Sequence, residues 1–145
     1  IVSELIIDCW ENEPHINHDL LTLTTIATPH IAGFSADGKA NGTRMCLENI
    51  ASYFHLQFTK IGEVLPPSPK NPIIDLNNFS ENRIEQAILQ CFNPLIIDKK
   101  LREAPHKFEW FRNNYNHPRE FSAYTITHAT KEEETILQQL GFKLS

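Results

Sequence analysis

The sequence predicts an α/β segment followed by a small α+β domain. Three observations lead to this fold class. A short apolar run at residues 4–8 ends in a carboxylate, as a buried parallel strand often does. Four prolines fall between residues 66 and 72, and such a stretch is too stiff to join a helix or a central strand. Beyond it, helical and strand-like patterns alternate to the last residue. We therefore expect a domain boundary at residues 65–72.

The first half of the chain is predicted to contain a second buried element and one long helix. Residues 20–27 fit either a strand or a helix followed by a strand, and Thr28 precedes a proline, which favours extended backbone. Ser35 is suited to cap a helix that ends before Gly62. The apolar positions of that helix are Met45, Leu47, Ile50, Ala51 and Phe54.

The second half is predicted to be mixed α+β. Ser80 is suited to cap an amphipathic helix, and Gly141 is suited to end the last one. The apolar face of the first of these helices consists of Ile84, Ala87, Ile88, Cys91 and Phe92. The other predicted elements are a strand at 73–76, a helix at 106–115, a strand at 121–128, a helix at 131–140 and an edge strand at 142–144.

Composition narrows the class of protein. The formal net charge is −5 and no run of Lys and Arg occurs, so we expect neither nucleic acid nor an anionic membrane as a partner. No apolar run approaches the roughly 18 residues of a membrane span. The three cysteines, Cys9, Cys46 and Cys91, are far apart and odd in number, which argues against a disulfide framework and against a zinc site. We expect a cytoplasmic protein without a metal.

Two short segments carry the side chains best suited to chemistry. Residues 8–14 read Asp-Cys-Trp-Glu-Asn-Glu-Pro, and residues 28–33 read Thr-Pro-His-Ile-Ala-Gly. Both follow predicted strands, at the end where open α/β sheets bind ligands. A carboxylate beside a histidine fixes the imidazole tautomer and favours its protonated form, which makes an acid/base centre. Spacing alone leaves simpler interpretations open, because His30 also suits a surface loop and Glu13-Pro14 also suits a turn.

Taken together, these two segments resemble the C-terminal signature of the D-2-hydroxyacid dehydrogenases. The resemblance implies that the α/β segment is the end of a Rossmann-type nucleotide-binding domain and that NAD is the cofactor. By the same match, His30 would be the general acid/base and Glu13 would orient and tune it. Asp8 matches the strand-end aspartate that contacts the nicotinamide side of the cofactor in that family.

Residues 30–43 and 112–124 resemble members of the family that carry an extra C-terminal dimerisation domain. The resemblance implies a phosphorylated 2-hydroxy acid as the substrate and a homodimer formed through the C-terminal domain. It divides the chain into the end of the nucleotide-binding domain at 1–34, a helix returning to the substrate domain at 35–64, a proline-rich linker at 65–72 and the dimerisation domain at 73–145.

Some parts that the family needs are missing from the sequence. The five glycines form no GxGxxG turn, and the family's catalytic arginine precedes the residue that matches Asp8. Because Ile1 runs straight into an apolar strand, we interpret the chain as the C-terminal part of a longer enzyme, inactive by itself. The alternative is another member of the family, similar to the phosphoglycerate dehydrogenases, whose C-terminal domain senses a small molecule.

Two further groups of side chains have more than one interpretation. A basic patch would suit a phosphorylated substrate, although surface charge or a dimer contact is the simpler explanation for its candidates, Lys107, Arg112 and Arg119. An aromatic cluster is predicted either in the core of the second domain or at a subunit interface, and consists of Phe108, Trp110 and Phe111.

Overall fold

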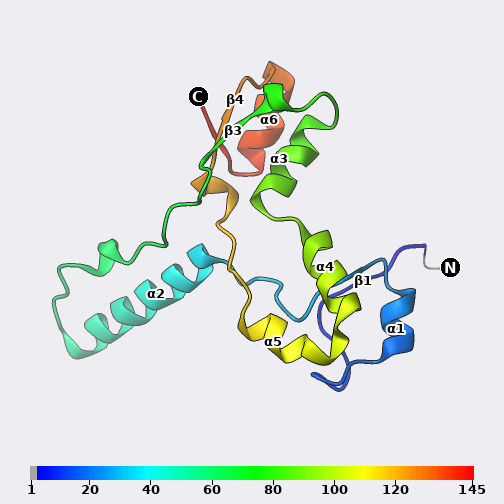
Figure 1. The fold of residues 1–145 in the computed structure, drawn as a ribbon. Coiled ribbons are helices and arrows are strands. Elements are labelled where there is room, and N and C mark those ends of the chain that lie inside the picture. Colours follow the sequence, from blue (N-terminus) through cyan, green and yellow to red (C-terminus); the bar gives the residue numbers. More distant parts are fainter. Residues whose placement is uncertain (1–2) are drawn as a thin grey trace. The chain divides into compact units, whose positions relative to one another are not determined.

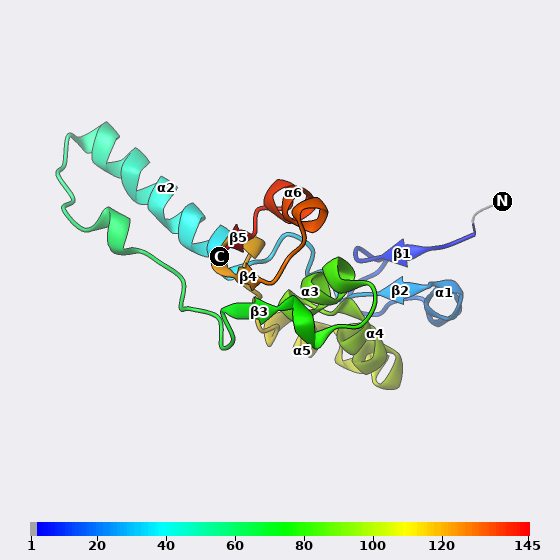
Figure 2. The ribbon, with the colours of Figure 1, turned by 90° about the horizontal axis from the view of Figure 1, so that it is seen from above.

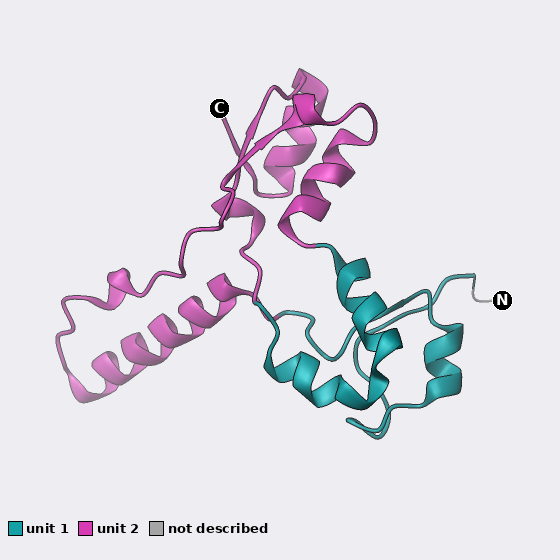
Figure 3. Ribbon diagram, in the orientation of Figure 1, with its two compact units in different colours: residues 1–33, 93–116 teal, residues 34–92, 117–145 magenta. Residues whose placement is uncertain are grey.

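The computed structural model describes residues 3–145, which divide into two compact units (Figures 1 and 3). Unit 1 consists of residues 3–33 and 93–116, and unit 2 of residues 34–92 and 117–145. Each unit is thus built from two segments that are distant in sequence. The division differs from the predicted one, which keeps 73–145 in a single domain. No helix within residues 3–145 is both long enough and apolar enough to cross a membrane.

Unit 1 contains a two-stranded parallel sheet. Its strands are β1 (Ile6–Ile7) and β2 (Ile26–Ala27), which lie side by side in Figure 2 and pair Ile6 with Ile26. Helix α1 (His18–Leu23) precedes β2, so the prediction of a helix followed by a strand is confirmed over residues 20–27. Asn17 begins α1, because its side chain accepts hydrogen bonds from the backbone N–H groups of the first turn.

Two helices from residues 93–116 complete unit 1. They are α4 (Pro94–Glu103) and α5 (Phe108–Asn113). α5 lies within the helix predicted at 106–115, whereas α4 is absent from the predicted elements. The signals for α4 are nevertheless present, since Asn93 caps it and Pro94 occupies its first turn.

The core of unit 1 holds its two segments together. Leu101 and Phe108 are buried at 0% and 1% exposure, and they pack with Trp10, Leu21 and Ala27 of the N-terminal segment. Burying each large apolar side chain contributes about 1.5–3 kcal/mol. This packing explains why residues 93–116 join unit 1. It also places Phe108 of the predicted aromatic cluster in the core of unit 1 rather than in the core of a separate second domain, while the alternative of a subunit interface stays a prediction.

Two charged side chains of α4 add polar links to the N-terminal segment. Asp98 Oδ1 accepts a hydrogen bond from the backbone N–H of Ala27 at 2.8 Å. Arg102 donates to the carbonyls of Leu21 and Thr24 at 2.8 and 2.6 Å, and its Nε lies 2.9 Å from both carboxylate oxygens of Asp98. Arg102 therefore pairs the carbonyl of Thr24 at the C-cap of α1 and adds a second hydrogen bond to the Leu21 carbonyl, which also accepts from the backbone N–H of Thr24.

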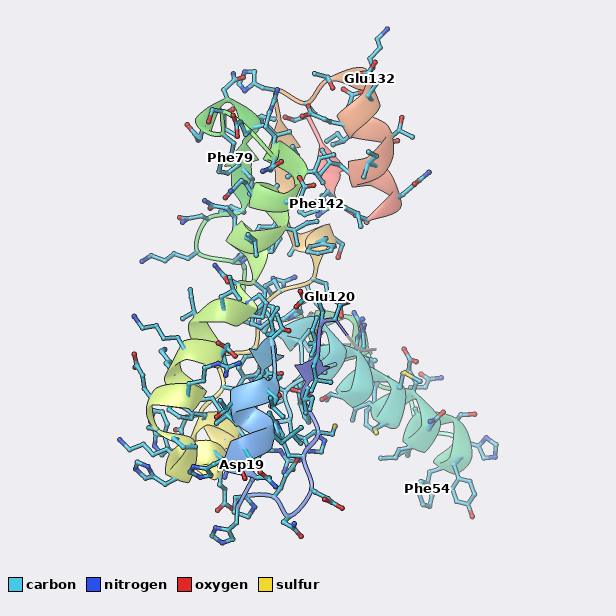
Figure 4. The ribbon with its side chains drawn as sticks, turned by 90° about the vertical axis from the view of Figure 1, so that its right-hand side faces the viewer. Asp19, Phe54, Phe79, Glu120, Glu132 and Phe142 are labelled. Carbon is cyan, nitrogen blue, oxygen red and sulfur yellow. The ribbon has the colours of Figure 1, made fainter. Side chains whose placement is uncertain are left out.

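Unit 2 contains a three-stranded parallel sheet with the order β3-β4-β5. Its core consists of side chains from the sheet and from two helices: Ile74, Leu76, Ala87, Cys91, Tyr124, Ile126, Leu137 and Phe142. Figure 4 labels Phe142 within this group. The elements are β3 (Ile73–Asp75), α3 (Arg83–Cys91), β4 (Thr125–Thr127), α6 (Lys131–Gln139) and β5 (Lys143–Leu144).

Most of these elements confirm the predictions for the second half, including the edge position of β5. Thr130 and Glu133 form a capping box at the start of α6, and Gly141 adopts φ +94° after its end. The predicted cap of α3 is wrong. The helix begins after Asn82, not after Ser80, and Asn82 has a left-handed backbone without a side-chain capping bond.

Helix α2 (Ala36–Phe54) starts at Ser35, as predicted, and ends well before Gly62. Ala40 is its buried residue, while Met45, Tyr53 and Phe54 are exposed at 61%, 78% and 62%. Figure 4 shows Phe54 at the far end of the helix, directed away from the ribbon. Most apolar side chains of α2 are therefore exposed, although the rings of Tyr53 and Phe54 contact each other and the helix contacts the 3-10 turn at Ile61–Glu63.

The proline-rich segment at 65–72 forms neither helix nor strand, which agrees with its predicted stiffness. It lies inside unit 2, so the chain does not pass from one unit to the other there. Arg119 is tied to the start of α2, because Nε and Nη2 donate to the two carboxylate oxygens of Asp37 at 2.9 and 3.0 Å. Arg119 is thus already paired with a carboxylate of unit 2, whereas Arg112 and Lys107 belong to unit 1.

Candidate functional site

Glu13 and His30, which the sequence predicts to act together, form a hydrogen-bonded pair in unit 1. The Nδ1 atom of His30 lies 2.8 Å from Oε2 of Glu13. The two side chains come from the loops after β1 and β2, whose carboxyl ends meet at one edge of the parallel sheet. Because the pair uses Nδ1, the Nε2 atom of His30 remains for another partner. Side-chain exposures of 36% for His30 and 19% for Glu13 leave the pair accessible to a small molecule.

Trp10 links the two loops that carry this pair. Its backbone N–H donates to Oε1 of Glu13 at 2.8 Å, and its indole Nε1 donates to the carbonyl of Thr28 at 2.9 Å. The Trp10 side chain is 7% exposed and belongs to the core of unit 1. Both oxygens of Glu13 are therefore held, one by the backbone and one by His30. The sequence offered one signal for this role, a tryptophan within an otherwise polar loop.

Asp8 shapes the loop on which His30 lies. Its Oδ1 accepts hydrogen bonds from Thr28 Oγ1 at 2.6 Å and from the backbone N–H of Ile31 at 2.8 Å, while Oδ2 accepts from the N–H of Ala32 at 3.0 Å. The backbone carbonyl of Asp8 also accepts from the N–H of His30 at 2.8 Å. These contacts hold His30 at φ +55°, a left-handed conformation that is uncommon for a side chain of this size.

The surroundings of Glu13 favour its ionised form. Burial raises the pKa of this carboxyl, but the net pKa lies below the ordinary value. The hydrogen bond from the Trp10 backbone, the hydrogen bond and charge of His30, and the positive charge of Arg112 outweigh the burial. Glu13 is therefore a carboxylate at neutral pH, able to accept the Nδ1–H of His30 and to stabilise a protonated imidazole.

Residues from the second segment of unit 1 also reach this site. Arg112 lies after the first turn of α5, and its positive charge contributes to lowering the pKa of Glu13. Burial, reinforced by the negative charge of Asp8, raises the pKa of Tyr115 to about 12, so its hydroxyl stays protonated. Spacing in the sequence gave no indication of this proximity, because both residues lie more than eighty positions after His30.

The residues around Asp8 are compatible with a nicotinamide cofactor. A carboxylate has about four acceptor positions, and the loop uses two on Oδ1 and one on Oδ2; the fourth contact is the long one from Cys9 Sγ to Oδ2 at 4.0 Å, which a carboxamide N–H₂ would replace. Gly33 is exposed at φ +79°, and a Cβ added to it would meet no other atom within 4 Å. Among residues 3–145, no group of three or more His, Cys, Asp and Glu is placed to hold a metal ion.

Similarity to known proteins agrees with the sequence pattern. Residues 64–141 match a family described as "Domain of unknown function (DUF3410)". An erythronate-4-phosphate dehydrogenase of Porphyromonas gingivalis is 55% identical over 97% of this chain, and the chain covers 38% of that relative. Proteins of the same name from Bacteroides thetaiotaomicron and Psychromonas ingrahamii are 46% and 34% identical over 87% and 98% of the chain.

The chain spans 38% or less of the length of these three relatives. The family match covers more than half of the chain and includes most of unit 2 together with α4 and α5. The chain therefore belongs to the family of the DUF3410 domain and matches the C-terminal region of erythronate-4-phosphate dehydrogenases.

Proposed function

We propose that this chain is the C-terminal part of an NAD-dependent dehydrogenase that oxidises 4-phospho-D-erythronate to the 2-oxo acid in pyridoxal phosphate biosynthesis. The observation that carries the proposal is the 2.8 Å contact between His30 Nδ1 and Glu13 Oε2. The hydrogen bond from the backbone N–H of Trp10 to Glu13 Oε1 holds the carboxylate in place for this contact. The names of the relatives supply the substrate, and the D-2-hydroxyacid dehydrogenase signature supplies the cofactor.

In this mechanism, His30 is the general base for the oxidation. Its Nε2 accepts the proton of the C2 hydroxyl while the C2–H bond breaks and the carbonyl forms. The bound NAD⁺ would supply the hydride acceptor. Glu13 keeps the Nδ1 proton in place and stabilises the imidazolium that results, and Asp8 holds the loop and would accept a hydrogen bond from the nicotinamide carboxamide.

The same proposal includes the assembly of the protein. Residues 1–34 form the end of a Rossmann-type domain, 35–64 return to the substrate domain, and the region after the proline-rich segment forms a homodimer in the cytoplasm. The 145-residue chain contains no GxGxxG turn, so by itself it is inactive.

Replacement of His30 tests the proposed role in the full-length protein. With His30→Ala, we expect kcat to fall about 10²–10⁴-fold, the usual contribution of a general acid/base. The affinity for NAD should change little, because the contact proposed for the cofactor is made by Asp8. Steady-state kinetics with 4-phospho-D-erythronate and a calorimetric titration with NAD measure the two quantities.

The matched control is His106→Ala, an exposed histidine of the same unit. It should retain normal turnover. Near-normal turnover in the His30→Ala protein would remove His30 from the reaction, and no oxidation by the unmodified full-length protein would overturn the proposed activity.

A further inference from the structure

We propose that Asp98 of α4 is a positioning residue for the acid/base pair: it fixes the end of β2 and so keeps His30 in contact with Glu13. The inference rests on the proposed function, since it concerns the same pair. It also gives part of the region that matches a domain of unknown function a role in the reaction, because α4 lies within residues 64–141.

The contact that carries the inference lies at the outer edge of β2. The backbone N–H groups of Ile26 and Thr28 donate to carbonyls of β1 and of the residue before it, at 3.2 and 2.9 Å. Backbone donors alternate in direction along a strand, so the N–H of Ala27 points away from β1, to the side where a further strand would pair. On that side, Asp98 Oδ1 accepts the Ala27 N–H at 2.8 Å.

Both partners of this hydrogen bond are shielded from solvent. Ala27 is 0% exposed, and the side chain of Asp98 is 13% exposed. Leu101, three residues further along α4, is also 0% exposed and packs in the same core as Ala27, so α4 covers this side of β2. The backbone N–H of Ala27 therefore depends on Asp98 for its acceptor, and leaving it unpaired would be costly.

Arg102 holds the Asp98 carboxylate in the orientation that this hydrogen bond needs. The two residues are four apart and lie on the same face of α4. Nε of Arg102 is 2.9 Å from both carboxylate oxygens, and its two Nη atoms donate to the carbonyls of Leu21 and Thr24 at 2.8 and 2.6 Å. A guanidinium with all its nitrogen atoms bonded restricts the rotation of the carboxylate that it pairs with.

The end of β2 leads directly into the acid/base site. Thr28, the residue after Ala27, is held on the β1 side, because its hydroxyl donates to Asp8 at 2.6 Å. His30 lies two residues further and contacts Glu13 at 2.8 Å. Asp98 holds the same stretch of backbone from the opposite side. Without it, β2 is fixed from β1 alone, and a displacement of about 1 Å in a reacting group can slow a reaction about 100-fold.

The first test replaces Asp98 in the full-length protein at saturating NAD. With Asp98→Ala, kcat for 4-phospho-D-erythronate should fall about ten- to hundredfold, while KM should change less than about threefold, because Asp98 does not touch the substrate. Asp98→Asn keeps an oxygen that can accept the Ala27 N–H and should restore part of the turnover. Glu103→Ala is the matched control, because Glu103 is an exposed carboxylate of the same helix that pairs with Lys99 at 3.9 Å. It should change neither constant.

The second test measures the position of His30 without turnover, in the 145-residue chain. With the histidine rings neutral, their nitrogen NMR signals show which nitrogen carries the proton, and Glu13 should hold that proton on Nδ1 of His30. Asp98→Ala should convert His30 to a mixture of the two tautomers. His128, whose Nδ1 lies 2.8 Å from Asp75 in unit 2, is an internal reference and should keep its signals.

Three results would overturn the inference: unchanged kcat in Asp98→Ala, a rise of KM with kcat unchanged, or a fall of kcat while the His30 ring keeps a single tautomer. Circular dichroism checks that the variants are folded. If Asp98→Ala does not fold, Arg102→Lys replaces it in both tests, because it keeps the charge but loses the planar donors that orient Asp98. Its kcat should fall at least about threefold.

Failure of the proposed function gives a different result. The unmodified full-length protein would then oxidise no 4-phospho-D-erythronate, while the NMR comparison would still decide whether Asp98 positions His30.

Discussion

Trp10 is the single residue on which the geometry of the site depends most. It contributes a backbone donor to Glu13, an indole donor to the loop of His30 and a large apolar surface to the core of unit 1. A buried side chain with a satisfied polar tip fixes position in two ways, by packing and by hydrogen-bond direction. The precision of the His30–Glu13 contact is therefore a consequence of core packing beneath it.

The chain contains two tryptophans, which allows a matched comparison. Trp10→Phe keeps an aromatic ring in the core but leaves the buried carbonyl of Thr28 without its donor, so we expect a loss of about 1–3 kcal/mol in the free energy of unfolding. Trp110→Phe, at a position 58% exposed, should change it by less than about 0.5 kcal/mol. Urea unfolding of the 145-residue chain followed by far-ultraviolet circular dichroism measures both. Equal losses of unfolding free energy in the two variants would show that the hydrogen bond from the Trp10 indole to the Thr28 carbonyl does not stabilise the fold.

At the site, the sequence predicted which residues meet but not what holds them. Glu13 and His30 each follow a strand whose end can be recognised in the sequence. Because the two strands are parallel, their carboxyl ends lie at the same edge of the sheet. The supporting role of Asp8 and the proximity of Arg112 and Tyr115 depend on tertiary packing across more than eighty residues of chain. The local periodicity of the sequence does not indicate which residues pack together when they are so far apart in the chain.

At the scale of elements, α2 is fixed at its start by side-chain and backbone hydrogen bonds, while most of its apolar side chains are exposed. Ser35 caps the helix, and Asp37 in the first turn accepts two hydrogen bonds from Arg119 and one from the backbone N–H of Glu120. A helix of this kind takes its direction from the anchored end, so the pair of Asp37 and Arg119 determines the direction of α2 within unit 2.

This anchor has a predictable dependence on pH. The hydrogen bond from Arg119 is the main cause that lowers the pKa of Asp37 below its ordinary value. A carboxyl whose pKa is lowered by folding contributes stability above its unfolded pKa and loses it as the pH falls through the folded value. We expect Asp37→Asn to reduce the free energy of unfolding by about 1–3 kcal/mol at pH 7. The difference from the unmodified chain should shrink below about pH 4.

Urea unfolding at a series of pH values from 3 to 7 measures this difference. Glu48→Gln serves as the control, because Glu48 is an exposed carboxylate of the same helix that forms no ion pair within residues 3–145. A difference between Asp37→Asn and the unmodified chain that stays constant down to pH 3 would show that the pair does not stabilise the fold.

The elements themselves were predictable where a cap and an apolar period coincide. Ser35 and Gly141 mark ends that the structure confirms. α4 was missed although Asn93 and Pro94 signal its start, because three adjacent apolar residues at 95–97 obscure the helical period. The start of α3 was placed too early because Ser80 is a good capping residue that the backbone does not use.

For the whole molecule, the main difference from the sequence prediction is that neither unit is contiguous. The chain leaves unit 1 after residue 33, returns at 93 and leaves again after 116. Proline-rich composition indicates a stiff segment, but it does not indicate which side chains pack on which, and Leu101 and Phe108 decide that for unit 1. A piece ending at residue 92 would therefore lack part of the core beneath Glu13 and His30.

Self-association of the whole chain is the remaining consequence of the proposed assembly. We expect the 16.7 kDa chain to sediment as a dimer, because unit 2 exposes apolar side chains that a monomer leaves in water. The proposed dimerisation region includes Ile136 and Leu140 at the end of α6, which are 47% and 37% exposed.

Sedimentation equilibrium over a wide concentration range should show that Ile136→Glu with Leu140→Glu dissociates the dimer. Met45→Ser with Tyr53→Ser on α2 should leave it intact. The reverse result would assign the interface to α2, and a monomer at every concentration would contradict the dimerisation proposal.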